Sequence, residues 1–257
     1  MSANKPLAVM SFNILTTRAA ARRWRWTHRR EAVLEAIRAF DGDVVGLQEA
    51  RRPQLQFLAD RLGDYEVVST GRGGGERLGE HTPVLFRRER FEKRDEGHFW
   101  LGPRPAVPGS RWWWSLPARV ASWVRLADRA NDGKEFVAVN THLCCFWRRA
   151  RLRGARLIRQ HVCDLARGGA AVVTGDFNAP LGGAVHDEFT RPGGEGDTLR
   201  EAVSDVSTDR GRRIDWIFCS KHFDVTDARI DRTHRRGRIA SDHWPVTAML
   251  AWRGRSD

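Results

Sequence analysis

The sequence predicts an α/β fold in which two β-sheets pack against each other beneath outer helices. Short apolar runs typical of buried strands recur along the chain, from Leu7–Ile14 to Val246–Trp252. Segments with the apolar spacing of helices lie between them, at Trp26–Phe40 and Arg148–Ala166. Many strands with helices inserted between them favour such a layered arrangement. No repeat and no low-complexity linker divides the 257 residues, so we expect a single domain over residues 1–257.

Each expected element has a local signal in the sequence. The first helix ends at Asp41-Gly42-Asp43, and Pro53 suits the first turn of a second helix that runs through Leu62. The helix at 148–166 ends at Gly168-Gly169, and the turn Asn131-Asp132-Gly133 predicts a strand pair at Val120–Leu126 and Phe136–Asn140. The remaining expected strands are Val44–Leu47, Tyr65–Ser69, Val84–Arg87, Ala170–Thr174, Ile214–Cys219 and Phe223–Ile230, and a long irregular stretch covers 98–117.

The chain is strongly basic, and arginine carries almost all of its positive charge. Lys and Arg total 44 against 32 Asp and Glu, a net charge of +12, and only four of the 44 are lysines. Arginine presents a planar fork of donors that can bind phosphate through two hydrogen bonds. This composition favours a polyanionic partner or a phosphate-bearing substrate, although a genome rich in G and C would also encode arginine in place of lysine.

Composition also excludes several classes of protein. Apolar residues make up 41% and charged residues 30%, which is enough for a core and argues against a disordered chain. No run of about 18 apolar residues is present, so we expect no membrane span. The N-terminal residues lack the apolar stretch of a secretory signal, which predicts a cytoplasmic location. The four cysteines include no Cys-x-x-Cys pair, which argues against a structural zinc site. We expect a monomer.

Polar residues that could carry chemistry stand where short apolar strands meet loops. Such side chains can converge above a sheet. Carboxylate and amide oxygens suit Mg²⁺ or Mn²⁺ better than zinc, and histidines with further carboxylates can handle charge and protons on a phosphoryl group. Any one of these residues alone is a weak signal, but their conjunction in one chain is far more specific. The residues are Asn13, Glu49, His142, Asp176, Asn178, Asp215, Asp242 and His243.

Six short motifs together resemble the endonuclease/exonuclease/phosphatase superfamily, which includes nucleases, sphingomyelinases and inositol-polyphosphate phosphatases. The resemblance spans residues 8 to 250 and implies a four-layer α/β sandwich, with two face-to-face mixed β-sheets flanked by α-helices. The segments at 97–102, 107–110 and 119–123 are similar to a bacterial branch whose substrate is not assigned. The motifs are Ser11-Phe12-Asn13, Leu47-Gln48-Glu49, Asn140-Thr141-His142-Leu143, Gly175-Asp176-Phe177-Asn178, Arg213-Ile214-Asp215-Trp216-Ile217-Phe218 and Ser241-Asp242-His243.

The resemblance implies a metal site and a position for the attacking water. Glu49 would bind the divalent metal with help from Asn13 and Asp242, and the metal would be Mg²⁺, with Mn²⁺ as a possible substitute. Asp176 would orient or deprotonate the water, and Asn178 would hold it together with a phosphoryl oxygen. This set agrees with the chemistry, because phosphoryl transfer depends mainly on in-line positioning and neutralisation of charge.

The resemblance also implies how the phosphoryl group is held. His243 would stabilise the pentacoordinate phosphorus, and His142 would contact a non-bridging oxygen while Asp215 holds it in position. The chain departs from the bacterial branch after Leu143, where Cys144-Cys145 replace an Asp-His pair common in relatives. Such changes leave the core motifs complete and put the choice of substrate in doubt.

Accessory features bear on that choice of substrate. Six arginines lie within residues 148–159 without one acidic residue, and a second basic cluster extends from Arg229 to Arg238. Each can be read as a solvated surface or as a binding surface. We expect Arg119, Trp113 and Arg236 to contact the substrate, with the tryptophan stacking on a base or partly buried under the long loop.

The sequence therefore predicts a divalent-metal-dependent hydrolase of phosphodiester bonds, and favours a nuclease with a nucleic acid as substrate. The alternative enzyme is a phosphohydrolase that acts on a lipid head group or another small phosphorylated molecule. The non-enzymatic alternative is a basic nucleic-acid-binding module on the same fold. The complete set of motif residues argues against a protein that has lost its activity.

Overall fold

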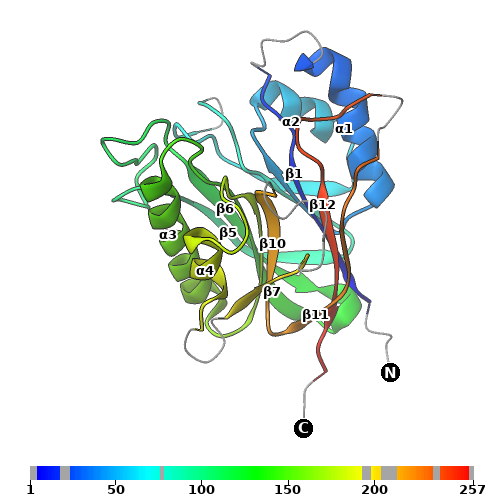
Figure 1. Ribbon diagram of the computed structural model, residues 1–257. Coiled ribbons are helices and arrows are strands. Elements are labelled where there is room, and N and C mark those ends of the chain that lie inside the picture. Colours follow the sequence, from blue (N-terminus) through cyan, green and yellow to red (C-terminus); the bar gives the residue numbers. More distant parts are fainter. Residues whose placement is uncertain are drawn as a thin grey trace.

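The computed structural model describes residues 5–17, 24–75, 78–192, 198–203, 213–233 and 238–254. Within these residues the strands form two six-stranded sheets (Figure 1). The first sheet contains β1 (Leu7–Asn13), β2 (Val44–Gln48), β3 (Tyr65–Val68), β4 (Val84–Arg87), β11 (Phe223–Ile230) and β12 (Val246–Trp252). The second contains β5 (Phe91–Trp100), β6 (Val120–Asp128), β7 (Lys134–His142), β8 (Ala170–Asp176), β9 (Leu199–Glu201) and β10 (Asp215–Ser220).

Each sheet is mixed, because one central pair of strands is parallel and the other pairs are antiparallel. The strand orders are β11-β12-β1-β2-β4-β3 and β5-β6-β7-β8-β10-β9. β1 is parallel to β2 in the first sheet, and β7 is parallel to β8 in the second. The helices are α1 (Trp26–Phe40), α2 (Arg52–Ala59), α3 (Arg148–Ala166) and α4 (Ala184–Thr190), with a short 3-10 helix at Arg129–Asn131. Among the described residues, no helix has both the length and the apolar character needed to cross a membrane.

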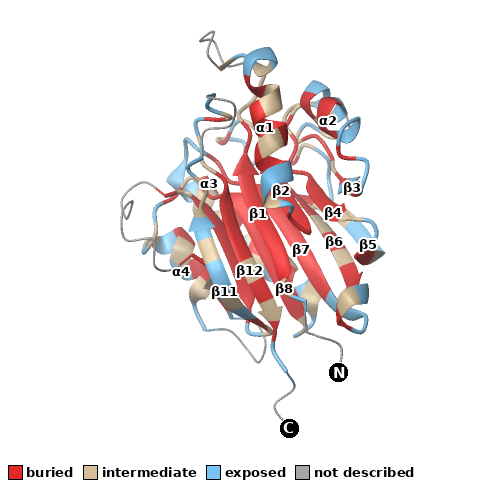
Figure 2. Ribbon diagram, turned by 90° about the vertical axis from the view of Figure 1, so that its right-hand side faces the viewer, coloured by how far each residue is buried: buried red, intermediate tan, exposed pale blue. Residues whose placement is uncertain are grey.

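The period-two alternation of strand side chains builds three apolar layers. Val9 of β1 packs against Phe136 of β7 in the core between the sheets. Its neighbour Met10 faces the opposite way, into the layer under α1 and α2. In the second sheet, Val173 packs with Ile158 of α3 in the layer under α3 and α4. The central strands are accordingly buried on both faces (Figure 2). The predicted four-layer sandwich is confirmed.

Strands β5 and β9 and helix α4 were not expected from the sequence, and β9 has only three residues. Strand β5 lies at the edge of its sheet, and its middle residues are exposed, so it is polar and lacks the apolar run of a buried strand. Helix α4 has only seven residues, too few for a helical period to stand out. The irregular stretch expected over 98–117 therefore begins after Trp100, where β5 ends.

The two sheets come very close together at Gly46, directly below the strand ends. A Cβ atom at this position would lie 2.1 Å from Thr174 Oγ1 and 2.8 Å from the Asn140 side chain. Buried amides cross the gap: Gln48 Nε2 donates to Asn140 Oδ1 at 2.7 Å, and Asn140 Nδ2 donates to the Leu47 carbonyl at 2.7 Å. These polar contacts between the two sheets thus fix the spacing and register of β2 against β7 and β8.

We predict that Gly46→Ala destabilises the protein by about 1–3 kcal/mol, because the added methyl group must push Thr174 and Asn140 aside. Urea denaturation measures the effect. Gly63→Ala is the matched control, since no atom lies within 4 Å of its new Cβ, and we expect a change of at most about 0.5 kcal/mol. Equal stabilities for the two variants would contradict the close approach of the sheets.

Candidate active site

Strand ends from both sheets meet at one edge of the sandwich. Because β1 and β2 are parallel, Asn13 is opposite Gln48, and Glu49 follows at the same edge. The parallel pairing of β7 and β8 likewise places His142 opposite Asp176. Strand β10 runs antiparallel to β8 and begins here, with Asp215 also opposite Asp176. The topology thus collects polar side chains that lie far apart in the sequence.

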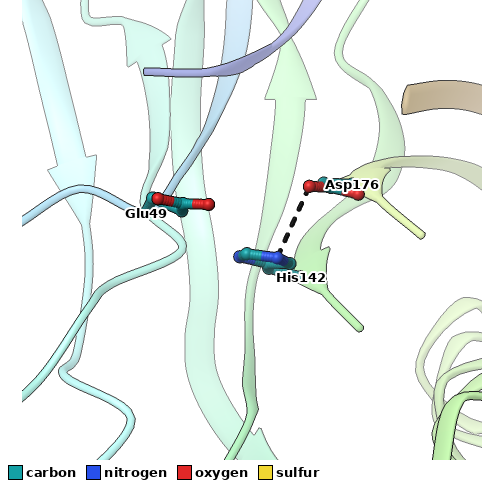
Figure 3. Close-up of side chains that lie close together, drawn as sticks. All are labelled: Glu49, His142 and Asp176. Carbon is teal, nitrogen blue, oxygen red and sulfur yellow. Dashed lines mark ion pairs between the residues drawn. The ribbon is translucent and has the colours of Figure 1, made fainter. Parts of the chain in front are cut away.

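Asp176 lies at the centre of this group and is almost completely buried. Its Oδ2 accepts a hydrogen bond from Asn13 Nδ2 at 2.9 Å and lies 3.4 Å from His142 Nε2 (Figure 3). Its Oδ1 accepts a hydrogen bond from the backbone N–H of Asn178 at 2.9 Å. His243 Nε2 lies 4.0 Å from Oδ2. Both histidines therefore approach the same carboxylate oxygen.

Glu49 faces Asp176 across the junction of the two sheets. Its Oε1 accepts a hydrogen bond from Asn13 Nδ2 at 3.2 Å, and its Oε2 accepts one from the backbone N–H of Thr16 at 2.9 Å. Ligand atoms of Glu49, His142 and Asp176 all lie within 4.8 Å of one another. Two carboxylates at this spacing are donors that a hard divalent cation prefers. Asn13 presents its amide nitrogen to both carboxylates, whereas its oxygen accepts from the N–H of Leu15 at 3.0 Å.

Three non-glycine residues at the site adopt left-handed backbone conformations. Leu15, Glu49 and Asn178 have φ values of 52°, 59° and 48°. The other described non-glycine residues with positive φ end helices, where such a conformation is common. Those at the site end no helix, and a left-handed non-glycine residue costs of order 1–3 kcal/mol. The fold therefore holds these residues in place against their local preference.

Asp215 pairs with His243, which corrects the expectation that it holds His142. Asp215 Oδ2 lies 2.7 Å from His243 Nδ1. The strand order gives the physical reason: β8 lies between β7 and β10, so Asp176 separates Asp215 from His142, and Asp215 contacts His243 from the loop before β12 instead. Asp215 Oδ1 is buried without a hydrogen-bond partner among the described residues. His142 instead lies against Asp176, as given above.

Burial and neighbouring charges set the protonation of the site. Burial, with the nearby charge of Asp215, raises the pKa of Asp176 to about 7 against the opposing effects of His243, Asn13 and the Asn178 N–H. Burial followed by positive charges, first that of Arg119, holds the pKa of His142 well below its usual value. Burial alone would lower the pKa of His243, but the charge and hydrogen bond of Asp215 raise it to about 10. One imidazole is thus neutral and the other cationic near neutral pH.

The remaining expected site residues differ in their placement. Asp242 is exposed, accepts a hydrogen bond from Ser241 Oγ at 3.2 Å, and stands outside the cluster around Asp176. Arg119 is buried beside His142, and its Nη2 donates to Cys145 Sγ at 3.5 Å, while its Nε has no partner among the described residues. The Trp113 side chain is 89% exposed. Arg236 lies outside the described residues.

Comparisons with known proteins agree with this fold. The sequence model of the endonuclease/exonuclease/phosphatase family matches residues 10–243. No curated protein sequence matches the chain. A solved endonuclease/exonuclease/phosphatase from Bacteroides vulgatus is 27% identical, with a TM-score of 0.88 over 97% of this chain and 100% of that chain.

Two further solved structures are similar over almost the whole chain. A mannosyl-6-phosphatase from Bacteroides thetaiotaomicron is 28% identical, with a TM-score of 0.85 over 96% of this chain and 100% of that chain. The human Nocturnin catalytic domain, solved with bound sulfate, is 22% identical, with a TM-score of 0.76 over 98% of this chain and 97% of that chain. The latter likeness concerns the fold alone.

Arg29 is a buried residue of the site's framework that sequence reasoning missed. Its side chain lies on α1 and donates to the carbonyl groups of Ile14 and Leu15, and to that of Ala240 at 3.1 Å. One guanidinium therefore joins the loop after β1 to the loop that carries His243. Burial lowers the pKa of Arg29 to about 10, a value still well above neutrality. A charged residue within the apolar stripe of a helix is the signal that could have revealed it.

We predict that Arg29→Lys keeps the positive charge but leaves carbonyl groups of both loops without a donor. Each missing hydrogen-bond donor costs about 1–3 kcal/mol, and a shift of about 1 Å in site residues can cost about a hundredfold in rate. Urea denaturation and kcat, measured where the variant is folded, test this. Arg30→Lys, on the adjacent and partly exposed residue, is the control. Wild-type kcat in Arg29→Lys would show that the loops hold their positions without this guanidinium.

Proposed function

Because the chain belongs to the endonuclease/exonuclease/phosphatase family, whose members hydrolyse phosphoesters, we propose that it is a divalent-metal-dependent phosphodiesterase that acts on nucleic acid. One observation carries the proposal. Two carboxylates and two imidazoles of opposite protonation converge where the two sheets meet. A phosphoryl group passing through its transition state needs positive charge on its oxygens and a base on the attacking water, and this cluster has the groups for both.

The donor set fits a hard divalent cation such as Mg²⁺. Glu49 would hold it through its carboxylate oxygens, helped by the Asn13 side chain, which also donates to Asp176 and keeps that carboxylate in place to act on the water. When bound, the metal would supply positive charge to the phosphoryl oxygens. Asp242, which the sequence analysis assigned to the metal, would act through its charge on His243 and Arg29. These assignments are proposals for a metal-bound state.

The chain's own residues would then divide the work on the phosphoryl group. Asp176, with a pKa near 7, would accept a proton from the attacking water, and Asn178 would orient that water. The cationic His243, held by Asp215, would stabilise charge on the phosphoryl oxygens as the transition state forms. His142, held neutral, would donate a hydrogen bond to a non-bridging oxygen.

The basic surface supports a nucleic acid as the substrate. Arg119 would contact a phosphoryl oxygen through its guanidinium, and Trp113 and Arg236 would contact other parts of the substrate. The net charge of +12 attracts a polyanion more strongly than a substrate with one phosphate. A small phosphorylated molecule is the second candidate, because the similar Bacteroides thetaiotaomicron protein is a mannosyl-6-phosphatase.

Glu49→Gln should lower hydrolysis by at least about a hundredfold, because it removes an anionic metal ligand while keeping the size of the side chain. We expect a chelator to abolish turnover of wild type and added Mg²⁺ to restore it. The substrates are single-stranded DNA, RNA and a hexose 6-phosphate, each with and without chelator. Glu31→Gln, on a partly exposed residue of α1, is the control. Hydrolysis of the hexose phosphate alone would favour the second candidate, and full activity in excess chelator would remove the metal from the proposal.

Asp176→Asn should abolish turnover and leave substrate binding close to wild type, because this carboxylate would act on the water and not on the substrate. The uncharged side chain still offers an oxygen to the Asn178 N–H. Binding is measured by fluorescence anisotropy of a labelled oligonucleotide, and turnover with the same oligonucleotide. A parallel loss of both would instead identify Asp176 as a group on which the whole site depends.

A further inference from the structure

A surface of exposed and half-buried aromatic and arginine side chains begins a few residues after His142. Phe146 and Trp147 are 72% and 51% exposed, although large apolar side chains are usually buried. They lie between the end of β7 and the start of α3, whose first residues are Arg148 and Arg149. We call Phe146, Trp147, Arg148, Arg149, Arg153 and the tryptophans Trp112 and Trp114 the aromatic–arginine surface.

The two halves of this surface are joined by specific contacts. The rings of Trp112 and Trp114 are nearly parallel, with centroids 6.2 Å apart. The Arg153 guanidinium lies 4.3 Å from the centroid of Trp112, and that of Arg149 lies 5.7 Å from the centroid of Trp114. Ser115 Oγ is 3.8 Å from Cys144 Sγ. The loop before β6 thus packs on the start of α3 and extends the surface there.

This surface is connected to the active site on two sides. Arg119, whose charge lowers the pKa of His142, donates to Cys145 directly before Phe146. A hollow opens between α3 and the segment that follows Asn178. It is lined by Arg148, Arg149, Arg151 and Leu152 on one side, and by Ala179, Pro180 and residues 183–185 on the other. A polymer bound with one phosphate at Asp176 would meet this surface next.

We propose that the aromatic–arginine surface binds the nucleotides next to the scissile bond of a single-stranded nucleic acid. A base would stack on Phe146 or Trp147, and a neighbouring phosphate would enter the arginine-lined hollow. Bases of a single strand offer free faces for such stacking, whereas those of a duplex are already stacked on each other. The inference rests on the proposed function only in placing the cleaved bond at Asp176.

The surface has the chemistry of a single-strand site in two respects. Arginine guanidinium groups lie over the tryptophan rings, so flat cationic and aromatic surfaces alternate. No acidic residue occurs between Leu143 and Cys163, which include the six arginines of residues 148–159. An anionic backbone therefore meets no opposing charge from this segment.

The test measures binding of fluorescein-labelled oligothymidylate by anisotropy in chelator, which makes it independent of catalysis. Phe146→Ser/Trp147→Ser should weaken binding about tenfold for each base that no longer stacks. The variant should fold, since both side chains are exposed and serine is a favourable residue at position 147, the N-cap of α3. Binding of the duplex with oligoadenylate should change by less than about twofold, because a duplex does not use the rings. Equal losses for single strand and duplex, or no loss, would overturn the proposal.

A second variant separates charge from stacking. Arg148→Ser/Arg149→Ser should reduce the slope of log affinity against log salt by about 0.7 for each phosphate that the protein no longer binds, and the aromatic variant should leave that slope unchanged. Arg94→Ser, on the exposed part of β5, removes one charge elsewhere and should change the slope very little. An unchanged slope in the arginine variant would overturn the assignment of the hollow to a phosphate.

Two further measurements keep this inference separate from the proposed function. Hydrolysis of bis(p-nitrophenyl) phosphate reports whether the active site works without a polymer, and Arg94→Ser should keep this activity within about twofold of wild type. If neither this diester nor the oligonucleotide is hydrolysed with Mg²⁺, the proposed function fails while the binding result still decides the inference.

Sedimentation with phosphatidylserine vesicles tests a membrane as partner. Vesicle binding that disappears in the aromatic variant, with oligonucleotide binding intact, would replace the nucleic acid by a lipid surface.

Discussion

The active site depends on one amide group that joins the two sheets. Asn13 ends β1 in the first sheet, and its side-chain NH₂ donates to Glu49 of the same sheet and to Asp176 of the second. Two carboxylates at this distance repel each other, and the amide reduces that cost by donating one hydrogen bond to each. Below them, Gln48 and Asn140 form a second amide contact across the same gap. The position of the carboxylates thus follows directly from the packing of the sandwich.

His142 and His243 lie beside the same carboxylate, that of Asp176, but differ in protonation. The reason is that each has a different charged residue as its other neighbour. His243 has Asp215 at 2.7 Å, whose charge outweighs the burial that would keep the ring neutral. His142 is more deeply buried and has Arg119 nearby, so burial and charge act in the same direction and keep it neutral. A site with one cationic and one neutral imidazole can stabilise negative charge and still offer a neutral donor. This difference therefore comes from the residue next to each ring, Asp215 for His243 and Arg119 for His142.

The sequence predicted the layers and the strand-end residues, because both depend on short-range patterns. Runs such as Val9–Phe12 mark buried strands, and the parallel pairs bring their carboxyl ends together. The partner of Asp215 could not be predicted, since it follows from the strand order, in which β8 separates β10 from β7 and so Asp215 from His142. Arg29 was missed for a related reason. Arg29 donates hydrogen bonds to carbonyl groups of two loops that are more than 200 residues apart in the sequence. No local sequence pattern predicts which carbonyl groups it binds.

The architecture separates the groups around Asp176 from the exposed surface that we propose binds the substrate. The carboxylates and histidines are held in position by sheet register, by buried amides and by Arg29. The segment after His142 has fewer such constraints, because its side chains at Phe146 and Trp147 are exposed and bury little surface against the core. Residues there can change at low cost in stability. A fold of this kind can keep one phosphoester chemistry while its surface loops come to hold very different substrates.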